Sequence, residues 1–166
     1  MDAITELKTM SVEDRSKLKW DDPRLDALAD KLEQKHELPP STLKALKWAE
    51  NTGLTDGKIS KSSNDSTTVN KSSGAKGLMQ IMDATQQLQG GMFKHNHLDP
   101  VESLDAAAKY LKYTLTNQYK GNVAAAFADY NGGPTVAKQV LKGKMPSNAE
   151  TAGYLNKIKE FYKQGK

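Results

Sequence analysis

Apolar residues recur every three or four positions along most of this chain, and glycine or proline interrupts each run. Residues at this spacing share one face of an α-helix, so each run predicts an amphipathic helix with one buried side. The predicted helices cover about residues 25–37, 41–50, 78–88, 100–115, 123–130, 136–140 and 150–162. We therefore expect a mainly α fold without internal repeats.

One polar stretch, residues 54–73, lacks this spacing. It is rich in Ser, Thr, Asn, Asp and Lys. Residues 58–60 and 67–69 flank the turn formers of 62–65, which predicts at most one small β-hairpin. The alternative is a mobile loop, and composition does not decide between the two.

The length of 166 residues suits one domain with its own core. Residues 1–22 read as an N-terminal helical extension, and residues 23–166 as the main domain. The chain has no cysteine, which excludes disulfides, thiolate catalysis and cysteine-ligated metals. No apolar run reaches the length of a membrane span, so we expect no stable membrane insertion. The N-terminus lacks a secretory signal pattern. The protein is expected to be a monomer.

The formal net charge of +4 is compatible with an anionic partner. The lysines form no run and no stripe interleaved with aromatic residues. Nucleic acid is therefore not an expected partner.

Glu50 is the residue with the clearest chemical prediction. A helix places it on the same face as Leu43 and Leu46, and Asn51-Thr52-Gly53 then ends the helix. Burial and the negative end of the helix dipole would both raise the pKa of this carboxyl, as a general acid for glycoside cleavage requires. The alternative is a frayed helix-end residue, exposed or paired with a lysine.

Four motifs, in order, give the chain a wider resemblance. They are Ala49-Glu50, Gly74-Ala-Lys-Gly-Leu-Met-Gln80, Ala128-Asp-Tyr-Asn-Gly-Gly-Pro134 and Glu150-Thr-Ala-Gly-Tyr154. Together they resemble the catalytic domain of soluble lytic transglycosylases, the bacterial and phage relatives of goose-type lysozyme. The resemblance implies a lysozyme-like (α+β, mainly α) helical bundle around a substrate cleft.

The resemblance implies cleavage of peptidoglycan glycan strands between N-acetylmuramic acid and N-acetylglucosamine. Glu50 would be the single acid and base, and the substrate's own C6 hydroxyl would close a 1,6-anhydro ring. Two alternatives remain: hydrolysis of the same bond by a goose-type lysozyme-like muramidase, and a non-catalytic wall-binding or virion structural module.

The resemblance also assigns roles to individual residues. Those expected to contact the glycan are Ser73, Met79, Gln80, Tyr130, Asn131 and Tyr154. The residues expected to pack behind the glycan-contacting residues and hold them in position are Gly77, Asp129 and Glu150. The candidates for aromatic groove walls are Tyr130, Tyr154 and Trp48.

Most of these residues also have a purely structural interpretation. The tyrosines have the spacing of core residues, and Asn131 that of a helix stop. Ser147-Asn-Ala-Glu150 is a capping-box pattern, so Glu150 has a rival role at the start of the last helix.

The chain departs from the family pattern at several positions. Asn51 and Asp129 replace smaller residues, and Lys71 stands where the family has a serine, with Ser73 nearby. Asp56 and Asp65, in the long polar segment, are candidate second carboxylates that would favour hydrolysis.

No metal or other cofactor is expected. His95 and His97 are close in sequence, but they lie beside Asn96 in a polar loop. Without a visible signal, an enzyme acting on the cell wall would reach it as a phage endolysin, as a virion-associated protein, or as part of a larger protein.

Overall fold

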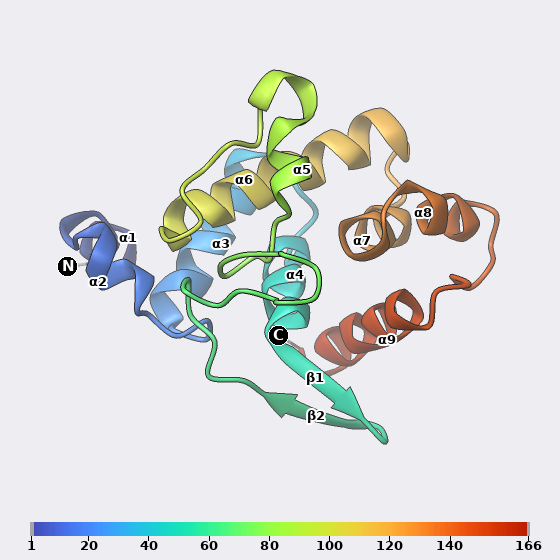
Figure 1. The fold of residues 1–166 in the computed structure, drawn as a ribbon, viewed down its shortest axis with the longest axis horizontal. Coiled ribbons are helices and arrows are strands. Elements are labelled where there is room, and N and C mark those ends of the chain that lie inside the picture. Colours follow the sequence, from blue (N-terminus) through green and yellow to red (C-terminus); the bar gives the residue numbers. More distant parts are fainter. Residues whose placement is uncertain (1, 166) are drawn as a thin grey trace.

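The computed structural model describes residues 2–165, whose regular elements are helices apart from one two-stranded hairpin (Figure 1). This confirms the mainly α expectation. The elements are α1 Ala3–Thr9, α2 Val12–Ser16, α3 Pro23–Lys35, α4 Thr42–Glu50, β1 Thr52–Thr55, β2 Lys58–Lys61, α5 Asp83–Gln87, the 3₁₀ helix η1 Leu88–Gly91, α6 Pro100–Tyr113, the π-helical turn η2 Thr114–Gln118, α7 Val123–Gly132, α8 Pro134–Leu141 and α9 Ala149–Lys163.

Helix α4 lies at the centre of the molecule. Figure 1 shows α1 and α2 on one side of it and α7 and α8 on the other. It contacts α3, α6 and α9, and Leu43, Ala45 and Leu46 have no exposed surface. The helix that carries Glu50 is thus held by neighbours on several sides.

A buried carboxylate satisfies the amino end of α4. Ser41, the residue before the helix, has a φ of 69° and makes no side-chain cap bond. Instead Glu33, on α3, accepts hydrogen bonds from the backbone amides of Ser41, Leu43 and Lys44 at 2.9, 2.9 and 3.1 Å. A negative charge at this end also complements the helix dipole.

The predicted hairpin is present, but its pairing was wrong. Strand β1 pairs with β2 in antiparallel register, Thr52 opposite Lys61 and Thr55 opposite Lys58. The turn is Asp56-Gly57, with φ values of 51° and 75°. Asp-Gly is the preferred pair for a two-residue turn with positive φ at both positions, so the sequence did contain the signal. Residues 67–69 instead lie in the following loop, where Val69 bridges to Lys76.

The helix predicted for residues 78–88 is also wrong over its first half. Residues 77–82 form an irregular loop, and the helix begins only at Asp83. Leu78, Met79 and Ile81 are buried although they are near neighbours in sequence, and Gln80 has a φ of 51°. A left-handed residue within the run ends the helical path, so the apolar spacing there reflects a buried loop.

The N-terminal helices pack onto the rest of the domain. Leu7 and Trp20 belong to the main core, and α1 contacts α3. Arg15 forms a bidentate ion pair with Asp99, in which Nε donates to Oδ1 at 3.1 Å and Nη2 donates to Oδ2 at 2.7 Å. Within residues 2–165, no helix is both long enough and apolar enough to cross a membrane.

Candidate active site

Glu50, the last residue of α4, lines a cavity of about 420 Å³. A second cavity of about 280 Å³ adjoins it, and the two share Gln80 and Asn131. The first is lined by Ala49, Glu50, Leu54, Asn70, Gln80, Asn131, Ala149, Glu150, Gly153, Tyr154 and Lys157. We call the joined cavities the Glu50 cleft. Their shape offers binding space on both sides of Gln80 and Asn131.

The carboxyl of Glu50 has an unusually high pKa. Burial is the largest influence and raises the pKa to about 7. The approach of the Tyr154 hydroxyl and the charge of Lys157 lower the pKa, and the charge of Glu150 raises it. A carboxyl with this pKa is protonated in a substantial fraction of molecules near neutral pH, so it can donate a proton and later accept one.

Tyr154 and Lys157, one turn apart on α9, face Glu50. The Tyr154 hydroxyl is buried and makes no hydrogen bond of ordinary geometry within residues 2–165. Lys157 donates to the carbonyl oxygens of Ala49 at 2.5 Å and Thr52 at 2.7 Å. The ammonium therefore satisfies the carboxyl end of α4 and brings a positive charge near Glu50.

Tyr130, near the end of α7, is hydrogen-bonded to the 77–80 loop through its hydroxyl. It donates to the backbone carbonyl of Met79 at 2.7 Å. Burial, followed by the charge of Glu50, raises the pKa of Tyr130 well above its ordinary value. Tyr130 thus stays a neutral donor that ties the 77–80 loop to α7.

Asp129, the neighbour of Tyr130, is buried beneath the second cavity. Its carboxylate accepts hydrogen bonds from the hydroxyls of Tyr110 and Tyr119. The Tyr110 ring lies 6.1 Å from the Tyr130 ring, centroid to centroid. The tyrosine hydroxyls satisfy Asp129 and brace the wall that carries Tyr130.

The 77–80 loop owes its shape to two residues with positive φ. Gly77 has a φ of 78°, and a Cβ there would lie 2.6 Å from the carbonyl oxygen of His97. Gln80 has a φ of 51°, and its amide nitrogen donates to the Gly77 carbonyl at 2.7 Å. The amide oxygen of Gln80 is then the group available to a ligand in the cleft. A left-handed glutamine at such a position is backbone strain of the kind found at functional sites.

Asn131 is oriented from behind by α9. Thr151 Oγ1 donates to Asn131 Oδ1 at 2.9 Å, so the amide nitrogen is the group that can donate to a ligand. Gly132 permits this contact, because a Cβ there would lie 2.3 Å from Thr151 Oγ1.

Glu150 lines the same cavity as Glu50. The predicted capping box is wrong: Asn148, rather than Ser147, caps α9, and its Oδ1 accepts from the Glu150 amide at 2.9 Å. Ser147 instead bonds Gln139. The Glu150 side chain is therefore free to act in the cleft.

Other predicted residues lie apart from the cleft surface. Met79 is fully buried, so it contributes through its backbone carbonyl. Ser73 is exposed and does not line the cleft, and its hydroxyl accepts from the Ala75 amide at 3.2 Å. Asp56 lies in the hairpin turn, and Asp65 accepts from Thr67 in a local turn.

The third aromatic candidate faces elsewhere. Trp48 is 4% exposed and packs against Phe161, with ring centroids 5.7 Å apart. It belongs to the core and not to the groove wall.

The sequence did not identify two polar residues of the first cavity, Asn70 and Lys157. Lys157 lies three residues after Tyr154, a helical spacing that places both on one face. That spacing is the signal that could have found it. Asn70 comes from an irregular loop and carried no comparable signal.

Among residues 2–165, no three His, Cys, Asp or Glu side chains converge into a metal-binding group. The groups that face the cleft are amides, hydroxyls, carboxyls and one ammonium. These are the groups with which proteins bind and cleave sugars.

A family model described as the transglycosylase SLT domain matches residues 27–152, about three quarters of the chain. The chain belongs to this family of lytic transglycosylases, which act on peptidoglycan, and the resemblance inferred from the motifs is thereby confirmed. The matched segment runs from α3 into the start of α9 and includes Glu50, Gln80, Asn131 and Glu150. Tyr154 and Lys157 lie just beyond it.

Proposed function

We propose that this protein cleaves the β-1,4 bond between N-acetylmuramic acid and N-acetylglucosamine and leaves a 1,6-anhydro-N-acetylmuramic acid end. The observation that carries the proposal is the pKa of about 7 for Glu50 at the edge of a polar cleft. A single group with this pKa can serve as both acid and base.

In the first step, protonated Glu50 gives its proton to the glycosidic oxygen as the bond to the muramic C1 breaks. The N-acetylglucosamine leaves with a new hydroxyl. In the second step, ionised Glu50 takes the proton of the muramic C6 hydroxyl, and the C6 oxygen bonds to C1 to close the 1,6-anhydro ring. Glu50 ends protonated, as it began, and no water is consumed.

The surrounding residues bind and orient the glycan in this proposal. Gln80 accepts a hydrogen bond from the substrate and Asn131 donates one. The unpaired Tyr154 hydroxyl donates either to the Glu50 carboxylate or to the reacting sugar. Lys157 positions the end of α4 and stabilises the ionised form of Glu50 between the two steps.

Hydrolysis by the same cleft has one observation in its favour. Glu150 is a second acidic side chain on the wall of the cavity that Glu50 lines. A second carboxylate that activates water would produce an ordinary reducing end. Asp56 and Asp65 do not line this cavity, so Glu150 is the residue to test.

The deciding experiment is mass spectrometry of muropeptides released from purified cell walls. The proposal predicts products lighter than hydrolytic ones by the elements of water. Glu50→Gln should lower the rate of wall lysis at least about 100-fold, and the exposed-site control Glu13→Gln should retain it. Lysis by Glu50→Gln at the parental rate would refute the mechanism.

The Glu150→Gln variant separates the two reactions. If reducing-end products form in the parent and disappear in this variant, the protein is a hydrolase. If anhydro products dominate in both proteins, Glu150 is a binding residue.

We further propose that the protein acts at the cell wall, and that residues 1–22 are an N-terminal addition to a catalytic domain of residues 23–166. The packing of Leu7 and Trp20 into the main core supports a structural role for this addition.

A further inference from the structure

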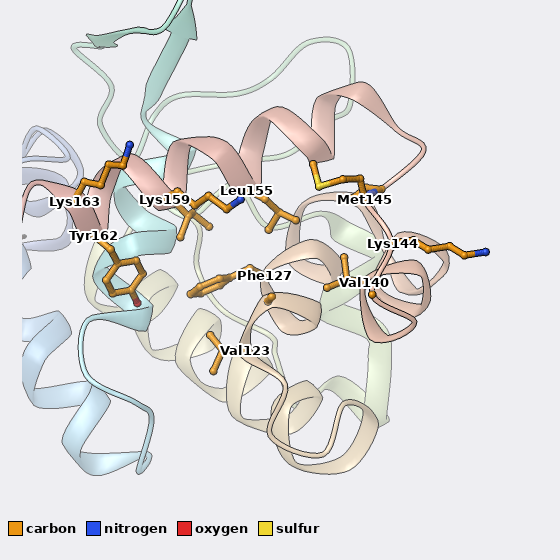
Figure 2. A pocket seen from close by; sticks show the side chains of 13 residues that line it. Val123, Phe127, Val140, Lys144, Met145, Leu155, Lys159, Tyr162 and Lys163 are labelled. Carbon is orange, nitrogen blue, oxygen red and sulfur yellow. The ribbon is translucent and has the colours of Figure 1, made fainter.

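A second hollow (Figure 2), larger than either cavity of the Glu50 cleft, shares no lining residue with that cleft. Its volume is about 910 Å³, and it is bounded by α7, the end of α8, the 143–146 loop and α9. Phe127 and Ile158 are buried residues of its lining, while Met145 and Tyr162 are 61% and 43% exposed. We call it the α8–α9 groove. An apolar hollow of this size is uncommon on a surface that meets only water.

The groove and the cleft use different faces of α9. Glu150, Tyr154 and Lys157 line the cleft, whereas Leu155, Ile158 and Tyr162 line the groove. At 100° per residue the centres of these two sets lie about 105° apart around the helix axis, so the groove and the cleft occupy different sides of the helix. A ligand in the groove would therefore leave the glycan site accessible.

Positive charge surrounds the groove. Lys144, Lys159 and Lys163 contribute to its walls, and in Figure 2 Lys144 and Lys163 lie at opposite ends of it. Within residues 2–165, Lys144 and Lys159 form no ion pair, and Lys163 has one exposed contact with Glu160 at 3.5 Å.

The excess of basic residues falls in the C-terminal segment of the chain, which supplies the three lysines of the groove. Residues 134–166 contain seven lysines and two glutamates, whereas residues 1–133 have 17 basic and 18 acidic residues. The net positive charge of the protein thus belongs to the segment that forms α8, the 143–146 loop and α9.

We propose that the α8–α9 groove docks an acidic amphipathic helix of a partner protein. A concave apolar channel between helices accepts the apolar ridge of a helix, whose side chains at positions i, i+4 and i+7 enter it. Acidic residues that flank this ridge would meet the lysines on the rim, while the lysine stems extend the apolar wall.

Two other occupants fit the groove less well. A bilayer surface is broad and would not reach the recessed Phe127, which is 4% exposed. A second copy of this chain, docked through the same face, would bring two sets of lysines together, and this repulsion opposes association.

Three synthetic helical peptides of about 18 residues would test the proposal. The first has Leu and Phe along one face and Glu on both flanks. The second has Lys in place of Glu, and the third has the composition of the first with the stripe scrambled. Fluorescence anisotropy with the intact protein should show that the first binds at least about tenfold more tightly than the others.

Matched variants locate the binding. Met145→Asp and Lys159→Glu should each weaken binding of the acidic peptide about fivefold or more. Lys142→Glu makes the same charge change at an exposed position outside the groove lining and should leave binding intact. Wall lysis is measured in parallel, and its loss would bear on the proposed function and not on docking.

Several outcomes would overturn the proposal. They are equal binding of the acidic and basic peptides, equal binding of the scrambled peptide, and equal effects of Lys142→Glu and Lys159→Glu. Stronger binding to phosphatidylglycerol vesicles than to the acidic peptide would point to a lipid surface. Dimerisation that Met145→Asp abolishes would show that a second copy is the occupant.

Discussion

At the scale of single residues, the proposed chemistry depends on which groups surround the carboxyl of Glu50. Burial raises the pKa of its carboxyl, while Tyr154 and Lys157 hold the rise to about 7. Full burial without these partners would keep the group protonated and unable to act as a base. An open position would keep it ionised and unable to act as an acid.

This pKa predicts a pH-dependent gain in stability for Glu50→Gln. The folded protein favours the protonated acid, because the pKa rises from an ordinary 4.5 to about 7. The stabilisation of the parent by this group is complete below about pH 4.5 and is lost as the pH rises through 7. Glutamine mimics the protonated form, so the unfolding free energy of the variant should match that of the parent near pH 4 and exceed it by about 3 kcal/mol above pH 8.

Urea unfolding across this pH range measures the effect, with Glu13→Gln as the control. A gain for Glu50→Gln that is the same at pH 4 and pH 8 would contradict the raised pKa.

Alanine substitutions at Gly77 and Gly74 distinguish the cost of backbone strain from the cost of steric overlap. Both have positive φ, 78° and 81°, but only at Gly77 does a Cβ meet another group, the His97 carbonyl oxygen at 2.6 Å. Gly74→Ala should therefore cost about 1 to 2 kcal/mol of unfolding free energy from backbone strain alone. Gly77→Ala should cost clearly more and should also slow wall lysis, because it displaces the loop that carries Gln80. Equal losses in thermal unfolding would show that the His97 contact is unimportant.

At the scale of elements, α4 is held at both ends by side chains from other helices. The carboxylate of Glu33 satisfies its amino end, and the ammonium of Lys157 satisfies its carboxyl end. Each charge has the sign that complements the helix dipole. Glu50, the proposed acid and base, thus occupies the last turn of a helix whose carboxyl end is hydrogen-bonded by Lys157, and this arrangement opposes fraying.

Lys157→Met should move the pH dependence of wall lysis. Lys157 lowers the pKa of Glu50, so its removal raises that pKa further. Because the proposed first step requires protonated Glu50, the alkaline limb of the activity profile should shift to higher pH. The turnover rate should fall as the α4 carbonyls lose their donor. Lys138→Met, at an exposed position of α8, is the control. A loss of rate with no shift of the alkaline limb would limit Lys157 to a structural role.

Regular elements were predicted well and irregular ones poorly. The helices at 23–35, 42–50, 100–113, 123–132 and 149–163 followed from apolar spacing. The spacing failed at residues 77–82, where Leu78 and Met79 are buried in a loop instead of on one face of a helix. Periodicity detects a buried side, and it cannot distinguish a helix from a buried loop with left-handed residues.

At the scale of the whole molecule, the N-terminal segment is part of the packed structure. Arg15 joins α2 to the start of α6 through Asp99, and its third nitrogen donates to the carbonyls of Leu7 and Met10 at 2.9 Å. The side chains of Arg15 and Asp99 are 14% and 4% exposed. We therefore expect residues 2–22 to unfold together with the catalytic domain.

Arg15→Met should destabilise the whole protein by about 3 kcal/mol or more, because it leaves the Asp99 carboxylate buried without a partner. Calorimetry should show a single transition at lower temperature. The double variant Arg15→Met with Asp99→Asn should recover part of the loss, since asparagine still caps α6 and carries no charge. Separate melting of the N-terminal helices would contradict this coupling.

The sequence by itself determined the mainly α class, most helix positions, the family and Glu50 as the candidate acid, because helical spacing and short motifs are local properties of the chain. Only the tertiary structure decided the neighbours of Glu50. Tyr154 and Lys157 follow it by more than 100 residues, and Gln80 and Asn131 come from two other segments. The pKa of a buried acid depends on distances between such segments, and those distances exist only after the helices have packed.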